Sequence, residues 1–242
     1  MVNKVAEFDN QKVKQEAHFY AGLGWFPTPG KPKSKKPLMG KGWNTLNLTG
    51  YEEIVEQFTK LGKNPYNLGL LVGKQMVDID LDSENSRKLA PFILPNTIKL
   101  KKGKLITHYL YHLDEGLEPI ATKQYPVPTE DLASKEMMCE LRGIDSRGNY
   151  QYTLTSGSIH PSGIKIERIG EEPHVIKSAE EIESLVRLLA FADVMVRHWG
   201  KGTRSNLALG VVGFLLKNGY QEDIIESALA CLLYTSPSPR DS

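Results

Sequence analysis

Apolar positions along this chain recur in two different periods, and the change between them divides the sequence. Up to about residue 177 the apolar runs are mostly short and strand-like, at 67–72, 75–81, 97–100, 105–113, 137–141, 150–155 and 164–169. In this part, helical spacing predicts helices over 11–23 and 51–61. After residue 178 the apolar residues keep helical spacing, which predicts helices over 182–195, 207–216 and 224–229. We therefore expect an α+β part followed by a helical one.

Glycine and proline mark where the predicted strands turn. Gly73-Lys74 and the run 101–104 (Lys-Lys-Gly-Lys) each interrupt two neighbouring strand-like runs, and both are typical of hairpins. Residues 25–27 (Trp-Phe-Pro) read as a short strand after the first helix. Residues 29–41 contain five lysines with prolines and glycines, which predicts a loop.

Composition narrows the class of protein. The chain has 242 residues, 40% of them hydrophobic, and 30 Lys and Arg against 29 Asp and Glu, a formal net charge of +1. This balance excludes a mostly disordered chain. No apolar run approaches the roughly 18 residues of a membrane span, and two cysteines cannot make a disulfide scaffold or a cysteine-rich zinc site. We predict a cytoplasmic protein without a membrane partner.

The last twelve residues, 231–242, form a Ser/Pro-containing tail after a helical pattern. The tail resembles the conceptual translation of a transposon-type sequencing adaptor; the alternative is a natural flexible linker. We expect about 230 native residues (242 − 12), with a native chain that continues further.

An acidic strand carries the candidate chemistry. In residues 76–82 (Met-Val-Asp-Ile-Asp-Leu-Asp), the apolar residues face one way and Asp78, Asp80 and Asp82 the other. Carboxylates two positions apart on one strand face, about 6.6 Å at Cα, can share a pair of divalent ions, the usual device for nucleotidyl transfer. Hard oxygen ligands select Mg²⁺ or Mn²⁺. The alternative is a solvated strand face.

Three other segments are weaker signals when each is taken alone. His108 lies on a strand, where a single histidine is often structural. Glu140 lies in an apolar strand two residues before Arg142. Residues 155–163 (Thr-Ser-Gly-Ser-Ile-His-Pro-Ser-Gly) are suited to surrounding a phosphate but are also compatible with a plain turn.

Taken in order, these segments resemble the bifunctional DNA primase/polymerase family of the archaeo-eukaryotic primase superfamily. The residues that carry the resemblance are Leu23-Gly-Trp-Phe-Pro27, Lys36-Pro37, Gly42-Trp43, Asn67-Leu-Gly-Leu-Leu-Val-Gly73, Asp78 and Asp80, His108, Glu140 with Arg142-Gly143, and Ser158 to Gly163. The likeness covers about residues 12–170. Two positions depart from the usual pattern: Thr107 stands before the histidine, and the third acid is Glu rather than Asp.

The resemblance implies a fold, an activity and a set of site residues. It implies an RNA-recognition-motif-like catalytic core of mixed or antiparallel sheet with flanking helices, followed by a truncated helical bundle. Asp78, Asp80 and Glu140 would hold two Mg²⁺ or Mn²⁺ ions and be the catalytic residues. The nucleotide-binding residues would be His108 at the triphosphate, Arg142 as a second phosphate contact, and Ser158 with His160 lining the pocket.

Basic residues outside this core are candidates for template binding. Lys36 and Lys41, with Lys101 and Lys102, lie in predicted loops and could follow a DNA backbone, although such loops are often only solvated. Arg204 lies near a predicted helix start. The segment around it resembles the helical part that follows the primase domain in plasmid and viral replication proteins, often ahead of a helicase.

We expect a catalytic domain over 1–177, the start of a helical domain over 178–230, and an artefact over 231–242. The predicted function is a template-dependent DNA primase and DNA polymerase of a plasmid, virus or other mobile element, acting on a single-stranded DNA template with NTPs or dNTPs. The alternative is a non-catalytic module of the same fold that positions a helicase. A rolling-circle nuclease is disfavoured, because His108 and His112 have three residues between them rather than one.

Overall fold

The structure is a computed structural model that describes residues 8–43, 51–129, 136–198 and 204–222, and the pairs 225–226 and 229–230. Helices there are α1 (Asn10–Gly22), α2 (Tyr51–Lys60), α3 (Glu84–Ile93), α4 (Ala179–His198) and α5 (Arg204–Lys217). Strands are β1 (Pro27–Gly30), β2 (Asn67–Val72), β3 (Met76–Leu81), β4 (Ile98–Lys102), β5 (Leu105–Leu113), β6 (Lys123–Pro126), β7 (Met137–Arg142), β8 (Gln151–Leu154), β9 (Ile166–Ile169) and β10 (Val175–Ile176).

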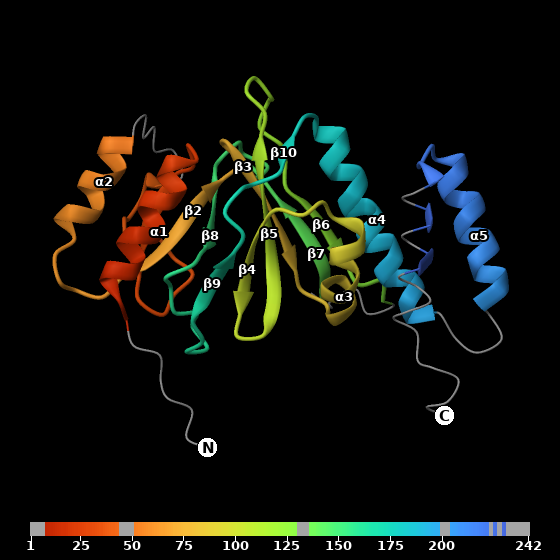
Figure 1. The fold of residues 1–242 in the computed structure, drawn as a ribbon, viewed down its shortest axis with the longest axis horizontal. Coiled ribbons are helices and arrows are strands. Elements are labelled where there is room, and N and C mark those ends of the chain that lie inside the picture. Colours follow the sequence, from red (N-terminus) through yellow and green to blue (C-terminus); the bar gives the residue numbers. More distant parts are fainter. Residues whose placement is uncertain are drawn as a thin grey trace, which may run out of the picture. The chain divides into compact units, whose positions relative to one another are not determined.

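The strands form two sheets. The smaller sheet has the order β1-β2-β8, with antiparallel pairing throughout. The larger sheet has the order β6-β7-β3-β5-β4-β9, and β10 adds a short parallel pairing to β5. The described elements are therefore α+β, with α4 and α5 following the sheets in sequence (Figure 1), and the sequence prediction of this class is confirmed.

The chain divides into two compact units. The first comprises residues 1–80, 97–123 and 141–179, and the second comprises 81–96, 124–140 and 180–242. The second unit thus takes two segments from the part that we predicted to be catalytic. The three-part division at residues 177 and 230 stays a prediction, and the tail at 231–242 lies outside the described residues.

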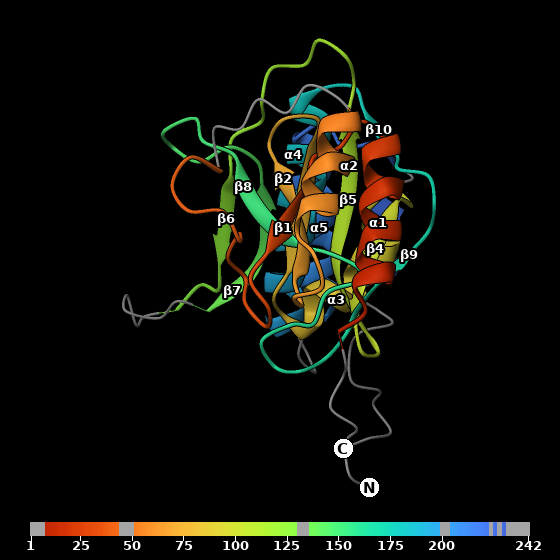
Figure 2. The ribbon, with the colours of Figure 1, turned by 90° about the vertical axis from the view of Figure 1, so that its left-hand side faces the viewer.

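The first helix begins and ends where its sequence predicts. The Asp9 side chain accepts a hydrogen bond from the Lys12 backbone N–H at 3.0 Å, which caps the N-terminus of α1. Gly24 follows the helix with a φ of +76°, a conformation that favours glycine. Tyr20 on the buried face of α1 stacks on Trp25, with ring centroids 5.8 Å apart. Figures 1 and 2 show α1 and α2 side by side.

One predicted hairpin forms and the other does not. β4 and β5 pair antiparallel around Gly103, as predicted from residues 101–104. The strands on either side of Gly73-Lys74 belong to different sheets, so the hairpin predicted there is wrong. Both edges of β2 are already hydrogen-bonded, to β1 and to β8. The turn at Gly73, closed by its N–H to the Met76 carbonyl at 2.8 Å, therefore carries the chain into the second sheet.

Two further elements differ from the prediction. The strand expected over 25–27 begins only at Pro27 and runs to Gly30. Helix α3 was missed, because Pro91 lies inside it and obscures the helical pattern. Its start nevertheless has an ordinary signal, since Ser83 accepts a hydrogen bond from the Ser86 N–H at 2.8 Å.

No helix in the described ranges is both long and apolar enough to cross a lipid bilayer.

Candidate active site

The acidic strand β3 buries its carboxylates to different degrees. The apolar residues between them are buried as predicted, but Asp78 is also fully buried and only 20% of the Asp80 side chain is exposed. Asp82 follows the end of the strand and is exposed. The face carrying Asp78 and Asp80 is therefore not a solvated strand face.

Three side chains surround the carboxylate of Asp78. His108 Nδ1 lies 3.1 Å from Oδ1 and 3.2 Å from Oδ2. Thr153 Oγ1 donates a hydrogen bond to Oδ2 at 2.6 Å, and Arg142 Nη1 lies 3.5 Å from the same oxygen. Such a set of donors is what a buried carboxylate needs in order to stay ionised.

These contacts move two pKa values in opposite directions. Burial alone would raise the pKa of Asp78, but the charge and hydrogen bond of His108, together with Arg142 and Thr153, bring it below its ordinary value. Burial would lower the pKa of His108, but Asp78 and Asp80 raise it above its ordinary value. Both directions favour an ionised aspartate beside an imidazolium.

His108 also faces the second carboxylate. Its Nδ1 lies 3.7 Å from Asp80 Oδ1, and the register of β3 on β5 places Asp80 directly opposite His108. The imidazole Nδ1 thus lies between the carboxylates of Asp78 and Asp80. A proton on this ring offsets the repulsion between the two carboxylates.

Packing in the smaller sheet directs Thr153 towards this carboxylate. The ring of the preceding residue, Tyr152, lies so close to Gly69 on β2 that a Cβ there would be 2.1 Å from it. Successive residues of a strand point to opposite faces, so Thr153 faces the other way, to Asp78. The sequence prediction missed Thr153; the polar alternation of Gln151 and Thr153 in the predicted strand was the available signal.

Arg142 lies in this cluster and makes contacts within the protein. Its Nη1 donates to Thr153 Oγ1 at 2.6 Å, and its Nη2 donates to the Tyr152 carbonyl at 3.2 Å. The guanidinium therefore braces β8 and adds positive charge beside Asp78. The predicted phosphate contact of Arg142 stays a prediction.

Glu140, the third predicted metal ligand, lies on β7 in the second unit, whereas Asp78 and Asp80 lie in the first. Gln124 Nε2 donates to Glu140 Oε1 at 2.9 Å. Within the described part of the chain, no group of three or more His, Cys, Asp and Glu side chains is arranged to hold a metal ion. The predicted three-carboxylate metal site therefore stays a prediction.

Hydrogen bonds to β2 hold the start of the segment Ser158–Gly163. Ser158 is buried, and its hydroxyl donates to the Leu68 carbonyl and accepts from the Leu68 N–H, both at 2.8 Å. Asn67 holds the next residue, because its side chain bonds both the N–H and the carbonyl of Ile159 at 3.0 Å. The Ser158 hydroxyl thus fixes the loop to β2, and its predicted place in a nucleotide pocket stays a prediction.

The loop fixes the ring of His160 through its Nδ1 atom, which leaves Nε2–H as the donor of a neutral ring. Its Nδ1 accepts the Ser162 N–H at 3.2 Å, so a proton on a neutral ring is carried by Nε2. Burial lowers the pKa of His160, and the positive charges of Lys102, Lys35 and His108 lower it further.

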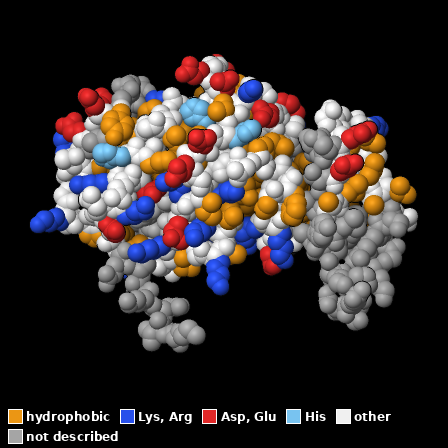
Figure 3. Space-filling model, viewed as in Figure 1, with side chains coloured by type: hydrophobic (Ala, Val, Ile, Leu, Met, Phe, Trp, Pro, Cys, Tyr) orange, Lys and Arg blue, Asp and Glu red, His pale blue; other side chains and the backbone are white. Residues whose placement is uncertain are grey.

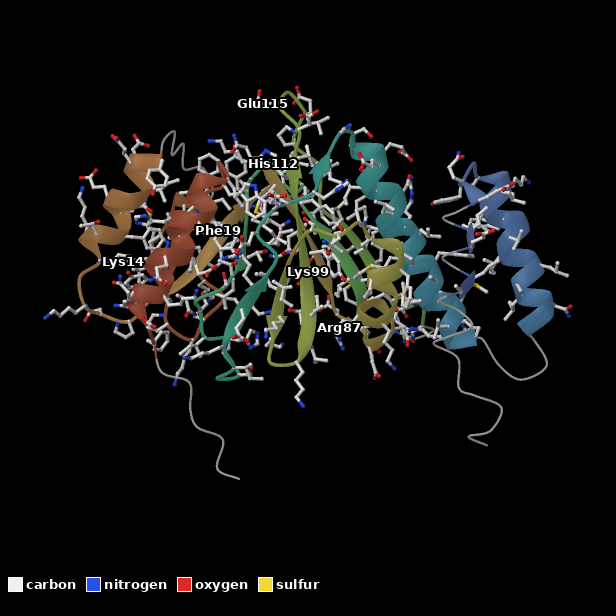
Figure 4. The ribbon with its side chains drawn as sticks, in the orientation of Figure 1. Lys14, Phe19, Arg87, Lys99, His112 and Glu115 are labelled. Carbon is white, nitrogen blue, oxygen red and sulfur yellow. The ribbon has the colours of Figure 1, made fainter. Side chains whose placement is uncertain are left out.

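The other histidine of β5, labelled in Figure 4, is part of the core packing. His112 Nδ1 accepts a hydrogen bond from Trp25 Nε1 at 2.8 Å, and the two rings stack. Burial lowers the pKa of His112. A ring used in this way is a structural histidine, whereas His108 faces two carboxylates.

The predicted DNA-binding lysines lie at or near the surface. Lys36 and Lys41 are exposed, and Lys101 and Lys102 are partly exposed on β4. Lys101 Nζ pairs with a carboxylate oxygen of Glu167 at 3.1 Å. Figure 3 shows Lys and Arg side chains gathered around the lower ends of β4, β5 and β9. Arg204 is the first residue of α5, and its predicted DNA contact stays a prediction.

A family model described as "Bifunctional DNA primase/polymerase, N-terminal" matches residues 17–184. The match includes β3, β5, β7 and β8, and therefore every residue of the cluster around Asp78. No curated protein matches the chain.

Proposed function

The chain belongs to the bifunctional DNA primase/polymerase family, and we propose that its reaction centre is the carboxylate pair of Asp78 and Asp80 with His108. Membership implies an enzyme of the DNA primase/polymerase class, a nucleotidyltransferase whose substrates are nucleotides and a DNA template. One observation carries the assignment of the centre: His108 Nδ1 lies 3.1 Å from Asp78 Oδ1 and 3.7 Å from Asp80 Oδ1.

The two carboxylates fit part of the ligand set of a divalent cation. Both are oxygen donors on one strand face, and the lowered pKa of Asp78 keeps it ionised near neutral pH. These are the hard ligands that Mg²⁺ and Mn²⁺ prefer, and the family generally uses such ions. A divalent ion held there would lower the pKa of an attacking 3′-hydroxyl and would stabilise charge on the reacting phosphate.

The third ligand of our proposal is Glu140. This assignment is supported by its position in the sequence motif, two residues before Arg142, and by the apolar strand that carries it. A glutamate still provides a carboxylate oxygen where the family more often has aspartate.

The predicted nucleotide-binding residues offer donors for phosphate oxygens. His108 faces the carboxylates, and a neutral His160 carries its proton on Nε2. We propose that His108 binds the triphosphate with Arg142 as a second phosphate contact, because charge-assisted donors are the strong partners of phosphate oxygens. Ser158 and His160 would line the nucleotide pocket.

Template binding is assigned to the predicted basic residues, Lys36, Lys41, Lys101, Lys102 and Arg204. The described lysines are exposed or partly exposed, as contacts to a DNA backbone require. Contacts of this kind are independent of base sequence and weaken as salt rises. A polymerase that accepts any template needs that property.

The wider setting rests on the resemblance. We propose an RNA-recognition-motif-like catalytic core followed by the start of a helical domain, and an origin in a plasmid, virus or other mobile element. In such proteins a helicase often follows the helical segment. α4 and α5 support this proposal to the extent that they are successive helices after the sheets.

The decisive experiment is primer extension on a primed single-stranded DNA template with Mg²⁺ or Mn²⁺. The full chain is compared with a double Asp78→Ala, Asp80→Ala variant and with Asp82→Asn, a matched acidic control that is exposed beyond the strand. We expect metal-dependent extension by the wild type and by the Asp82 variant, and none by the double variant. Unaltered extension by the double variant would overturn the assignment of the centre.

Two further outcomes are informative. A folded wild type that binds DNA but does not extend primers would favour a non-catalytic module that positions a helicase. Glu140→Gln tests the third ligand separately, and extension at the wild-type rate would remove Glu140 from the site. Repeating the assay without a primer measures priming.

A further inference from the structure

The two oxygens of the Asp78 carboxylate have different surroundings. Oδ2 receives the Thr153 hydrogen bond at 2.6 Å and lies 3.5 Å from Arg142 Nη1. His108 Nδ1 lies 3.1 Å from Oδ1 and 3.2 Å from Oδ2, so the imidazole does not distinguish the two oxygens. The difference between them is that Oδ2 is also bonded to Thr153 of β8 and faces Arg142.

The direction of the hydrogen bonds at Thr153 is set by Arg142. A guanidinium has only donors, so its Nη1 must donate to Thr153 Oγ1, at 2.6 Å. The single hydroxyl proton of Thr153 is then available for Asp78 Oδ2. The chain of donors runs from Arg142 through Thr153 to Asp78, and it cannot reverse.

This contact joins the two sheets. Thr153 lies on β8 of the smaller sheet, paired with Leu70, and Asp78 lies on β3 of the larger one. Thr153 is 1% exposed and Asp78 is fully buried, so water does not readily replace the bond. The orientation of the carboxylate therefore depends on where β8 lies.

A carboxylate needs such an anchor because its terminal torsion is soft. Rotation about χ2 of aspartate is broad and roughly two-fold, so the side chain alone does not choose which oxygen faces a ligand. A fixed partner on one oxygen makes that choice. Partners behind a metal ligand have this effect in many metal sites.

We propose that Thr153 is a positioning residue, which holds Oδ2 of Asp78 against β8 and so reserves Oδ1 for the divalent ion. Thr153 touches neither the ion nor the nucleotide; it acts through Asp78. The proposal rests on the proposed function, because it presumes that Asp78 is a metal ligand. Its new content is that a hydroxyl on the other sheet determines the metal affinity of the acidic strand.

The test uses variants that separate the hydroxyl from the shape of the side chain. Thr153→Val keeps the branched shape and removes the hydroxyl, and Thr153→Ser keeps the hydroxyl. Thr155→Val is the matched control, because Thr155 is equally buried on the same stretch of chain but donates to Tyr20 Oη at 2.8 Å. Thr153→Ala is a second hydroxyl-free variant in case the valine variant fails to fold.

Two measurements are made on each protein. Mn²⁺ binding is followed by the electron paramagnetic resonance signal of free Mn²⁺, which needs no turnover, and primer extension is titrated with Mn²⁺ and with nucleotide. We expect Thr153→Val to bind Mn²⁺ roughly 10- to 100-fold more weakly and to need correspondingly more for extension. The KM for nucleotide at saturating Mn²⁺ should stay near that of the wild type. Thr153→Ser and Thr155→Val should bind Mn²⁺ like the wild type.

Mn²⁺ affinity of the valine and alanine variants equal to that of the wild type would overturn the proposal. A serine variant as weak as the valine variant would also overturn it, since the methyl group rather than the hydroxyl would then matter. These results differ from failure of the proposed function, in which the wild type itself neither binds Mn²⁺ nor extends a primer.

Discussion

Two fully buried aspartates invite comparison, Asp78 in the first unit and Asp193 in the second. Each accepts a hydrogen bond from a hydroxyl, Thr153 for Asp78 and Ser83 for Asp193. Each also has an arginine within 4 Å. Burial and pairing alone therefore do not distinguish the aspartate of the proposed reaction centre from a structural one.

The difference lies in the remaining partners. Asp193 on α4 is paired with Arg197, one turn along the same helix, with Nε 2.7 Å from Oδ1. Its hydroxyl partner is Ser83, the N-cap of α3, so the carboxylate joins two helices. Asp78 instead shares an imidazole with a second acid, Asp80.

The two aspartates differ in the kind of positive group that balances their charge. An arginine keeps its charge at any physiological pH, so Asp193 is permanently paired. A histidine can give up its proton near neutrality, so part of the charge that balances Asp78 is exchangeable. A carboxylate pair whose counter-ion can leave is suited to receiving another cation, and the following predictions test that distinction.

The largest expected effect is on catalysis. Asp78→Asn should lower the rate of primer extension roughly 1,000-fold, the scale of losing a main electrostatic group of a reaction centre. Asp193→Asn should keep the rate per folded molecule within about threefold, because Asp193 acts on helix packing. Single-turnover primer extension measures both rates, and melting curves show whether each variant is folded. Equal losses of rate in the two variants would contradict the distinction between Asp78 and Asp193.

For folding stability, Asp193 is the aspartate whose replacement we expect to matter. Asp193→Ala leaves Arg197 and the Ser83 hydroxyl without their shared carboxylate, and breaking a buried pair costs about 3 kcal/mol of unfolding free energy. Glu180→Ala on the exposed surface of α4 is the control, with an expected change below about 1 kcal/mol. Urea unfolding followed by circular dichroism gives both values. A change below 1 kcal/mol for Asp193→Ala would contradict a structural role.

The exchangeable charge predicts a dependence of stability on pH. The pKa of Asp78 is lowered, so Asp78 stabilises the fold at pH values above its ordinary pKa of 3.8, and this stabilisation is lost as pH falls through the lowered pKa. The pKa of His108 is raised, so His108 stabilises the fold at pH values below its ordinary pKa of 6.5, and this stabilisation is lost as pH rises through the raised pKa. The free energy of unfolding in EDTA should therefore fall as pH rises from 6 through the raised pKa of His108.

Asp78→Asn provides the control for this pH effect. The substitution removes the charge that most raises the pKa of His108. Burial, which lowers this pKa, is then opposed less strongly, so the pKa of His108 should fall. The fall in stability as pH rises should shrink or vanish. An identical fall in both proteins would show that the pair is not its source.

The smallest effects belong to surface charges. Lys102→Ala should weaken binding of single-stranded DNA a few-fold and reduce the slope of log affinity against log salt by about 1. Lys101→Ala should do less, because Lys101 is already paired with Glu167. Fluorescence anisotropy over a range of NaCl concentrations measures both slopes, and unchanged slopes would remove this hairpin from the proposed template path.

Local patterns in the sequence predicted several elements well. β2 is found at 67–72 as expected, and β4 and β5 form the predicted hairpin around Gly103. The acidic strand was predicted with Asp78 and Asp80 on one face. These features depend on neighbouring residues, through the period of two and the turn conformation of glycine, so a single sequence carries them.

The sequence did not predict features that join distant segments. The separation of β2 and β3 into different sheets depends on β1 and β8, which occupy both edges of β2. Helix α3 lacked a clear pattern, although Ser83 marked its start. The contacts of Arg142 with Thr153 and the backbone of β8 were not predicted either, because they join segments that are distant from the residue's own motif.

The sequence by itself determined the family and the order of its motifs, because short runs of fixed residue types carry both. Only the tertiary structure decided that Asp78 is buried and that Thr153, 75 residues away, fixes one of its oxygens. The physical reason is that burial and hydrogen bonding are properties of the assembled sheets. The residue pattern specifies which way a side chain points from its strand, and the partner it meets is set by the strand that packs opposite.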